Sequence, residues 1–444
     1  MSALLYADDI VLLAENKRDL QRMLDVVAGY AKKWRFELNP KKSQVVVFGM
    51  RQPPRTVKWW LGESEIEQVG QYKYLGIELT RTLRWNVYLK RILAKAQRNM
   101  TQALAMGVSG GFMSTRLANI IWMSMVRSII EYGCEISGEG RFVDLEKLQI
   151  AMGKRILRCG SRMTEEVVRG ELGWERHVAR RDEMRLRYWA KLVRMGDERI
   201  AKIIYKTSKR RLEQEEEALL PLTKTWCKYT RDLLKELHLA EFWQTEAVGT
   251  EADWNKLVRE RIHEREEIKW RTQCLLRPKL RTYCKIKKDL KFEPYLQLHH
   301  RGGIPELAKI RGGSNRLRIE QGRYEKEQIN QRVCRLCANG DVEDESHFML
   351  QCSVYDDLRN VMWTKFRQAT GWDKSRFANN DERLNALIGY RFQPSATNKG
   401  KTAGTAKRIY QDVVQCVMTF VTTAMKRRRI LLDNDRGHVR FGRS

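Results

Sequence analysis

Long hydrophobic runs are missing from this 444-residue sequence. A membrane-spanning helix needs roughly 18 or more consecutive apolar residues, and no stretch approaches that length. The first apolar stretch is interrupted by Asp8 and Asp9, so neither membrane insertion nor a membrane-surface partner has support. Internal repeats and extended low-complexity segments are also absent, and a chain of this length is expected to hold more than one domain.

The sequence also lacks a disulfide framework and a secretory signal. Three of its nine cysteines belong to a metal-binding motif described below, and the other six are scattered: Cys134, Cys159, Cys227, Cys274, Cys284 and Cys416. Disulfide scaffolds are typical of oxidising compartments and of regular cysteine spacings. We therefore expect an intracellular protein, located in the nucleus, the cytoplasm or both.

Acidic residues are outnumbered along the whole chain. Asp and Glu number 55 against 84 Lys and Arg, which gives a formal net charge of +29 that is not held in one tail. This balance is typical of proteins that bind nucleic acid. Because cationic contacts to phosphates carry little sequence information, we expect strong salt dependence and broad specificity. The predicted partners are RNA and DNA.

An acidic motif, Tyr6-Ala7-Asp8-Asp9, lies between the apolar stretches Ala3–Leu5 and Ile10–Leu13. Two strands of this length would place both carboxylates at the tip of a tight hairpin. Mg²⁺ takes oxygen ligands and keeps substrate phosphates in its shell, and two-metal nucleotidyl transferases hold their ions with acidic side chains. Asp8 and Asp9 are therefore candidate Mg²⁺ ligands. The alternative is a solvated acidic turn.

A βαββ pattern begins with this motif. Apolar residues keep helical spacing from Asn16 to Trp34, with Asn16 as the predicted N-cap and Asp19 three residues later. A break at Asn39-Pro40 then precedes short β-rich segments at residues 45–48, 57–60, 66–69 and 72–77, with a turn at Gly62.

This order of motifs resembles the second half of the palm of a reverse transcriptase from the non-LTR (LINE-type) retrotransposons. Tyr6–Asp9 resembles the catalytic turn of that family, Leu38–Ser43 resembles its next motif, and Tyr74-Leu75-Gly76 resembles its primer-grip turn. The resemblance implies a Mg²⁺-dependent RNA-directed DNA polymerase that acts on the RNA of its parent element.

The resemblance also gives roles to individual residues. Asp8 and Asp9 would be catalytic Mg²⁺ ligands. Lys42 would lie near the nucleotide phosphates, where an ammonium group stabilises or protonates the leaving pyrophosphate. Gly76 would let the chain turn close to the primer. The alternatives are an ordinary surface lysine and an ordinary tight turn.

Basic amphipathic helices are predicted after residue 80, and they look like the thumb of LINE-type enzymes. The segments are Trp85–Ala105, Leu117–Gly133, residues 145–157, and Glu171–Trp174 with the arginine-rich helix after it. Their apolar stripes indicate a helical core. The last helix is expected to turn a basic outer face to nucleic acid, formed by Arg176, Arg180, Arg181, Arg185, Arg187, Lys191 and Arg194.

A second motif lies near the other end, where Cys334, Cys337, His347 and Cys352 have the spacing C-x2-C-x9-H-x4-C. Such a knuckle can present four soft or borderline ligands to one tetrahedral Zn²⁺ ion and gain folding free energy from it. The acidic residues inside it, at 341 and 343–345, are expected to form a solvated loop. In non-LTR elements a similar knuckle, followed by a segment like Tyr355–Arg359, lies downstream of the polymerase.

The fold class expected from these observations is α+β: a partial palm followed by a mostly helical thumb and a C-terminal region with a small zinc knuckle. The predicted parts are the palm at 1–80, the thumb at 81–200, a charged helical connection at 201–315, the knuckle region at 316–370 and a basic helical region at 371–444. In the last part, Lys426–Arg429 is a candidate phosphate contact, nuclear localisation signal or solvated helix end.

The sequence departs from the family pattern at its start. Only five residues precede Tyr6, whereas the family places a further palm aspartate and the fingers upstream. We therefore expect that this chain alone does not polymerise. Two functions follow: part of a retrotransposon polymerase, or a non-catalytic RNA- and DNA-binding protein built from thumb and knuckle. A mobile-intron maturase shares the Tyr6–Asp9 motif but does not predict the knuckle.

Overall fold

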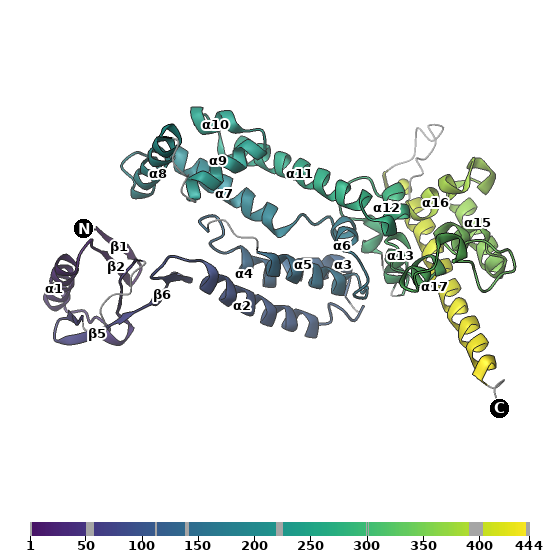
Figure 1. Cartoon of the computed structure of the whole chain (residues 1–444), viewed down its shortest axis with the longest axis horizontal. Helices are drawn as coiled ribbons and strands as arrows, with labels where there is room; N and C mark the ends of the chain where they lie inside the picture. The colour runs from purple at the N-terminus through teal and green to yellow at the C-terminus, as the bar shows by residue number, and fades with distance from the viewer. Residues whose placement is uncertain are drawn as a thin grey trace. The chain divides into compact units, whose positions relative to one another are not determined.

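The computed structural model describes residues 2–49, 57–111, 113–137, 142–218, 225–298, 300, 302–389 and 403–440. The chain forms two compact units, Met1–Lys95 and Ala96–Ser444. Strands occur in the first unit and helices fill the second (Figure 1). The protein is therefore α+β, as predicted. The predicted division into palm, thumb and three further parts stays a prediction.

The first unit contains seven strands and one long helix in its described part. The elements are β1 (Ser2–Tyr6), β2 (Asp9–Leu13), α1 (Lys17–Trp34), the 3₁₀ turn η1 (Pro40–Lys42), β3 (Gln44–Val46), β4 (Trp59–Leu61), β5 (Ser64–Val69), β6 (Gln71–Tyr74) and β7 (Ile77–Thr80). Strands β1 and β2 form one antiparallel hairpin and β6 and β7 form another. The third sheet has the order β3-β5-β4, with β3 parallel and β4 antiparallel to β5.

Helix α1 covers the three-stranded sheet. Its N-cap is Asn16, whose side chain accepts a hydrogen bond from the Asp19 N–H at 2.9 Å, so the predicted cap is confirmed. The Gln21 amide bonds both the N–H and the C=O of Trp60 on β4, at 3.0 and 2.7 Å. These bonds satisfy an edge of the sheet and fix α1 above a small apolar core of Leu24, Val45, Trp59, Leu61 and Ile66.

The second unit is built almost entirely from helices. Helix α2 (Asn86–Ala105) begins before the unit boundary. After it come α3 (Thr115–Ile121), the π segment η2 (Trp122–Arg127), α4 (Ser128–Glu131), α5 (Val143–Ile156), α6 (Glu165–Leu172), α7 (His177–Arg194), α8 (Ile200–Glu217), α9 (Trp226–Glu236), α10 (Ala240–Thr245) and α11 (Glu251–Leu275). The predicted helix at Leu117–Gly133 is present as α3, η2 and α4 in direct succession.

The remaining elements surround the cysteine motif. They are η3 (Pro278–Leu280), α12 (Arg281–Ile286), α13 (Gly303–Arg311), α14 (Arg318–Tyr324), the π segment η6 (His347–Gln351), α15 (Asp356–Thr370), α16 (Asn380–Ile388) and α17 (Ala403–Arg440). Helix α17 packs against both α15 and α13. Its middle part is buried from Val413 to Met425 on one face, because valine, methionine and phenylalanine recur there at helical spacing.

Tryptophans dominate the core between α7, α8, α10 and α11. The Trp189 ring lies 5.3 Å from that of Trp254 and is stacked on Trp243 at 6.2 Å. Two of these buried indole N–H groups have partners: Trp189 donates to the Tyr205 hydroxyl at 3.1 Å and Trp254 to the Leu186 carbonyl at 3.0 Å. The tryptophans of these helices are thus core residues rather than surfaces for stacking bases.

Candidate functional site

The acidic motif forms the turn of the β1–β2 hairpin. Tyr6 pairs with Asp9, so Ala7 and Asp8 make a two-residue turn, with Ala7 in the left-handed region at φ 52°. Asp8, Asp9 and the Tyr6 ring are exposed. Within the described residues β1 and β2 pair with no other strand, and no third ligand atom joins the two aspartates in a metal-binding group. The hairpin therefore presents two carboxylates at its tip, as predicted, and their role as Mg²⁺ ligands stays a prediction.

The other two polymerase-like motifs lie on short turns of the same unit. Lys42 ends the 3₁₀ turn η1, which Asn39 caps, and its side chain is exposed. The Tyr72 hydroxyl donates to the Lys42 carbonyl at 3.4 Å and so connects this turn to β6. Leu75 and Gly76 form the two-residue turn between β6 and β7, with φ values of 44° and 83°. Positive φ at both positions is the hairpin geometry that favours glycine.

The cysteine motif converges in space. One ligand atom from each of Cys334, Cys337, His347 and Cys352 lies within 4.8 Å of every other. A tetrahedral zinc ion with Zn–S bonds of about 2.3 Å has sulfur atoms about 3.8 Å apart. The His347 Nε2 atom already lies 3.4 Å from the Cys337 Sγ atom. These four residues can therefore hold a metal ion, with small side-chain adjustments.

Hydrogen bonds from neighbouring backbone and side-chain groups position three of the four ligands. The Cys334 N–H donates to the Asp341 carbonyl at 2.9 Å, next to the Val333–Val342 bridge, and this small hairpin orients Cys334. The Asp344 carboxylate accepts the His347 N–H at 2.8 Å and begins η6. From α15, Arg359 donates to the Cys352 carbonyl at 2.7 Å.

One thiol of the cluster favours its ionised form. The hydrogen bond from Cys352 lowers the pKa of the Cys334 thiol to about 3, against the opposing effect of burial, whereas the pKa values of the Cys337 and Cys352 thiols are raised. A thiolate is the form that binds zinc. The second ring nitrogen of His347, Nδ1, faces the Asp341 carboxylate at 3.6 Å, and His347 is buried to 1% exposure. Carboxylates in this position orient metal-binding histidines.

The acidic residues of the knuckle were predicted to be solvated, and for two of them this prediction is wrong. Glu343 and Glu345 are each 1% exposed. Glu343 forms a bidentate ion pair with Arg428 of α17, with N–O distances of 2.6 and 2.7 Å. Glu345 accepts hydrogen bonds from Arg281 and Thr282 of α12, at 2.8 and 2.9 Å. A buried carboxylate needs such partners, and through them Glu343 connects the knuckle to α17 and Glu345 connects it to α12.

The basic run on α17 is accordingly only partly available to a ligand. Arg428 is 4% exposed and pairs with Glu343, and Arg427 forms a bidentate pair with Asp357 at 2.6 and 2.7 Å. Lys426 and Arg429 are exposed. The solvated helix end proposed as one alternative is therefore wrong for Arg428 alone, since the Arg427 side chain is 34% exposed.

The basic outer face predicted on α7 is wrong. Of its seven cations, only Lys191 and Arg194 are exposed. Arg181 and Arg185 are buried and donate to the Ser137 hydroxyl and carbonyl, respectively. Arg180 and Arg187 both pair with Glu183, and Arg176 pairs with Glu266 of α11 at 2.7 Å.

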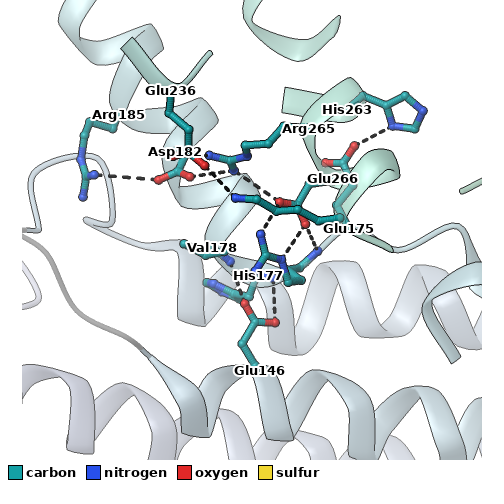
Figure 2. Close-up of polar contacts among 12 residues, drawn as sticks. Glu146, Glu175, His177, Val178, Asp182, Arg185, Glu236, His263, Arg265 and Glu266 are labelled. Carbon is teal, nitrogen blue, oxygen red and sulfur yellow. Dashed lines mark hydrogen bonds and ion pairs between the residues drawn. The ribbon is translucent and has the colours of Figure 1, made fainter. Parts of the chain in front are cut away.

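A polar network links α5, the start of α7 and α11, with Glu146, Asp182, Arg265 and Glu266 among its members (Figure 2). Glu266, which is 0% exposed, accepts from Arg176 at 2.7 and 2.8 Å and lies 3.4 Å from Arg169. Burial would raise the pKa of Glu266, but the hydrogen bond and charge of Arg176 lower it overall. Glu146 of α5 accepts the N–H groups of His177 and Val178 at 2.9 Å, which satisfies the first turn of α7.

Helical spacing could not distinguish this network from a solvated face. The arginines of α7 and the glutamates of α11 are residue types that usually lie at the surface. The segment from Arg259 to Arg271 carries acidic and basic residues on both faces of α11, so its charges alone do not indicate which are buried: Glu266 is buried, whereas Arg259, Arg261 and Glu264 are exposed.

Comparisons with known proteins agree with the hairpin motifs. Residues 1–79 match the family model described as reverse transcriptase (RNA-dependent DNA polymerase). The chain is also 28% identical over 156 residues to a protein of Drosophila melanogaster described as a probable RNA-directed DNA polymerase from transposon BS. That match covers 34% of this chain and 17% of the relative, so the chain spans a small part of the relative's length.

The first unit therefore contains a reverse transcriptase region, of the kind that transposons encode. This confirms the predicted resemblance to a non-LTR retrotransposon reverse transcriptase.

Separately, among the described helices none is both long enough and apolar enough to cross a membrane.

Proposed function

We propose that this chain carries the part of a non-LTR retrotransposon RNA-directed DNA polymerase that runs from the catalytic turn to a C-terminal zinc knuckle. The match of residues 1–79 to the reverse transcriptase family carries the proposal. In it, Asp8 and Asp9 bind Mg²⁺, Lys42 contacts the nucleotide phosphates, and Tyr74-Leu75-Gly76 contacts the primer. Their exposure on tight turns is compatible with these roles.

In the same proposal this stretch binds RNA and DNA, including the RNA of its parent element, but does not polymerise alone. Two carboxylates on a two-stranded hairpin give Mg²⁺ fewer protein ligands than a two-ion mechanism uses. The net charge of +29 supports phosphate binding. The alternative, a binding protein without catalysis, makes the same predictions for the isolated chain.

A primer-extension assay tests the proposal that the chain does not polymerise alone. The purified chain is given a primed RNA template, dNTPs and Mg²⁺, and we expect no template-dependent incorporation. Incorporation that is lost in Asp8→Asn and Asp9→Asn would show that the chain is a polymerase by itself. Anisotropy titrations with labelled RNA and DNA test the binding half, and we expect affinity to fall steeply as salt rises.

Zinc is the metal proposed for the Cys334, Cys337, His347 and Cys352 cluster. Three thiolates and one imidazole form a common structural zinc set, and the ion would supply the charge that holds them together. Elemental analysis of the purified chain and of Cys334→Ser tests this. We expect stoichiometric zinc in the first and its loss in the second, whereas zinc retained by Cys334→Ser would contradict the assignment.

A further inference from the structure

A group of cations gathers around one exposed tyrosine of the second unit, and no motif pointed to it. Lys154 ends α5, Arg162 follows in the loop before α6, Lys279 lies in η3, and Arg323 and Tyr324 end α14. The guanidinium carbons of Arg162 and Arg323 lie 5.3 and 5.1 Å from the centroid of the Tyr324 ring. We call these five residues the Tyr324 cluster.

The fold holds this cluster in place. The Lys279 ammonium group, 7% exposed, donates to the Arg162 carbonyl at 2.7 Å. Lys154 donates to the carbonyl of Ser161 at 3.0 Å, and the Ser314 hydroxyl also reaches the Arg162 carbonyl, at 3.3 Å. Two segments that are distant in sequence, and Lys154 of the preceding helix, therefore fix the backbone from which the exposed Arg162 side chain extends.

The positive charge of the cluster is poorly neutralised. In the described part of the chain Arg162, Lys154 and Lys279 form no ion pair with a carboxylate. Arg323 pairs with Glu320 at 3.2 Å, but Glu320 is shared with Arg281 at the same distance. The pKa of Lys279 is lowered by burial and further by the charges of Arg323, Arg162 and Lys154, against the effect of Glu320. The positive charges of Arg323, Arg162 and Lys154 therefore all act on Lys279.

The tyrosine adds a second kind of contact. Its side chain is 57% exposed, although large aromatic residues elsewhere in this unit are mainly core. Two guanidinium groups beside the ring hold it in position through cation–π contacts, and Arg323 donates to its hydroxyl at 3.3 Å. An exposed aromatic ring between cations is the arrangement with which proteins bind unpaired bases and their flanking phosphates.

We propose that the Tyr324 cluster binds single-stranded nucleic acid, with an unpaired base against Tyr324 and backbone phosphates on Arg162, Arg323 and Lys154. This deepens the proposed function, on which it rests, by giving its nucleic-acid binding a location. It also places nucleic-acid binding outside α7, where only Lys191 and Arg194 of the seven cations are exposed. The base-stacking contact favours unpaired strands over duplexes, because bases in a duplex already stack on one another.

The test uses the full chain and fluorescence anisotropy with single-stranded RNA, single-stranded DNA and duplex DNA of one length. Arg162→Gln should lower the slope of log affinity against log salt by about 0.7 per lost phosphate contact. Tyr324→Ala should weaken single-strand binding at least about fivefold, the lower end of base stacking energies, with little change in that slope. Tyr324→Phe should bind almost as well as the unmodified chain.

Matched controls are available. Tyr30 of α1 is 55% exposed, and Arg210 of α8 is exposed, so Tyr30→Ala and Arg210→Gln remove the same groups elsewhere. We expect both to bind as the unmodified chain does. Circular dichroism melts check that each variant is folded. A strand carrying 5-bromouracil should crosslink under ultraviolet light at Tyr324, and this readout does not depend on substitution.

The outcomes separate the two proposals. A chain that binds no nucleic acid at all overturns both. Binding that Arg162→Gln and Tyr324→Ala change no more than the controls, with no crosslink at Tyr324, overturns only the assignment to this cluster. Equal losses for duplex and single strands, with Tyr324→Ala unchanged, would identify a charge patch and refute the stacking contact. The comparison of the affinities for single-stranded RNA and single-stranded DNA shows which of the two the site binds more tightly.

Discussion

The ion pair between Glu343 and Arg428 should be a large contributor to the stability of the second unit. Both residues are buried, at 1% and 4% exposure, and two N–O distances of 2.6 and 2.7 Å join them. The Arg428→Met substitution leaves Glu343 with the Arg318 N–H, at 2.7 Å, but without its counter-charge. Removing one partner of a buried pair costs about 3–5 kcal/mol.

That loss predicts a measurable shift in melting. At about 2.1 cal/mol/K of unfolding entropy per residue, a unit spanning Ala96–Ser444 loses about 4–7 °C in Tm for this change. Arg427→Met is the matched control, since Arg427 lies one residue away and holds Asp357 at 2.6 and 2.7 Å, but the Asp357 side chain is 62% exposed. Water can replace that partner, so we expect a far smaller shift.

The assay is urea and thermal unfolding of both variants and of Glu343→Gln/Arg428→Met. The double variant removes both charges and should be more stable than Arg428→Met alone, because no buried charge is left unpaired. Equal losses for Arg428→Met and Arg427→Met would refute the reasoning from burial. A double variant that is less stable than either single variant would refute the reasoning from pairing.

Three further predictions concern other parts of the chain. Burial and the charge of Arg181 lower the pKa of His177 to about 3, so its neutral form stabilises the fold above the unfolded pKa of about 6.5. This stability should be lost as the pH falls from about 6.5 towards 3, by about 2 kcal/mol at pH 5, and His177→Phe should flatten the unfolding profile over that range. Chelation of the metal, or Cys334→Ser, should lower the Tm of the second unit and increase proteolysis near the knuckle, and an unchanged Tm would argue against a structural metal. Asp8→Asn/Asp9→Asn should leave Tm and salt-sensitive RNA binding unchanged, because both carboxylates are exposed and their proposed role is catalytic; a lower Tm would assign them a structural role.

Local elements were largely predictable from local chemistry. Asn16 begins α1 because its side chain accepts an N–H that the helix cannot use, and this depends on residues three positions apart. The hairpin turns at Ala7-Asp8 and Leu75-Gly76 likewise follow from two apolar or aromatic strands joined by two residues. The cysteine and histidine spacing indicated the ligands of the metal cluster, and the structure brings all four together.

The surroundings of charged residues were not predictable in this way. Glu343 was expected in water because acidic residues usually are, but its partner Arg428 lies 85 positions away in the sequence. The basic stripe of α7 had the same spacing whether it faced solvent or α11. Whether an arginine meets phosphate or a buried glutamate depends on which helix packs against it, and helical periodicity does not contain that information.

The sequence by itself determined the reverse transcriptase region, its hairpin turns and the four candidate metal ligands, because each depends on residue types at short, fixed spacings. Only the tertiary structure decided where the excess positive charge is available. Packing paired Arg176 with Glu266 of α11, enclosed Arg181 and Arg185, and brought Arg162 and Arg323 to the Tyr324 ring. Coulombic interactions act across space rather than along the chain, so the fold was needed to place them.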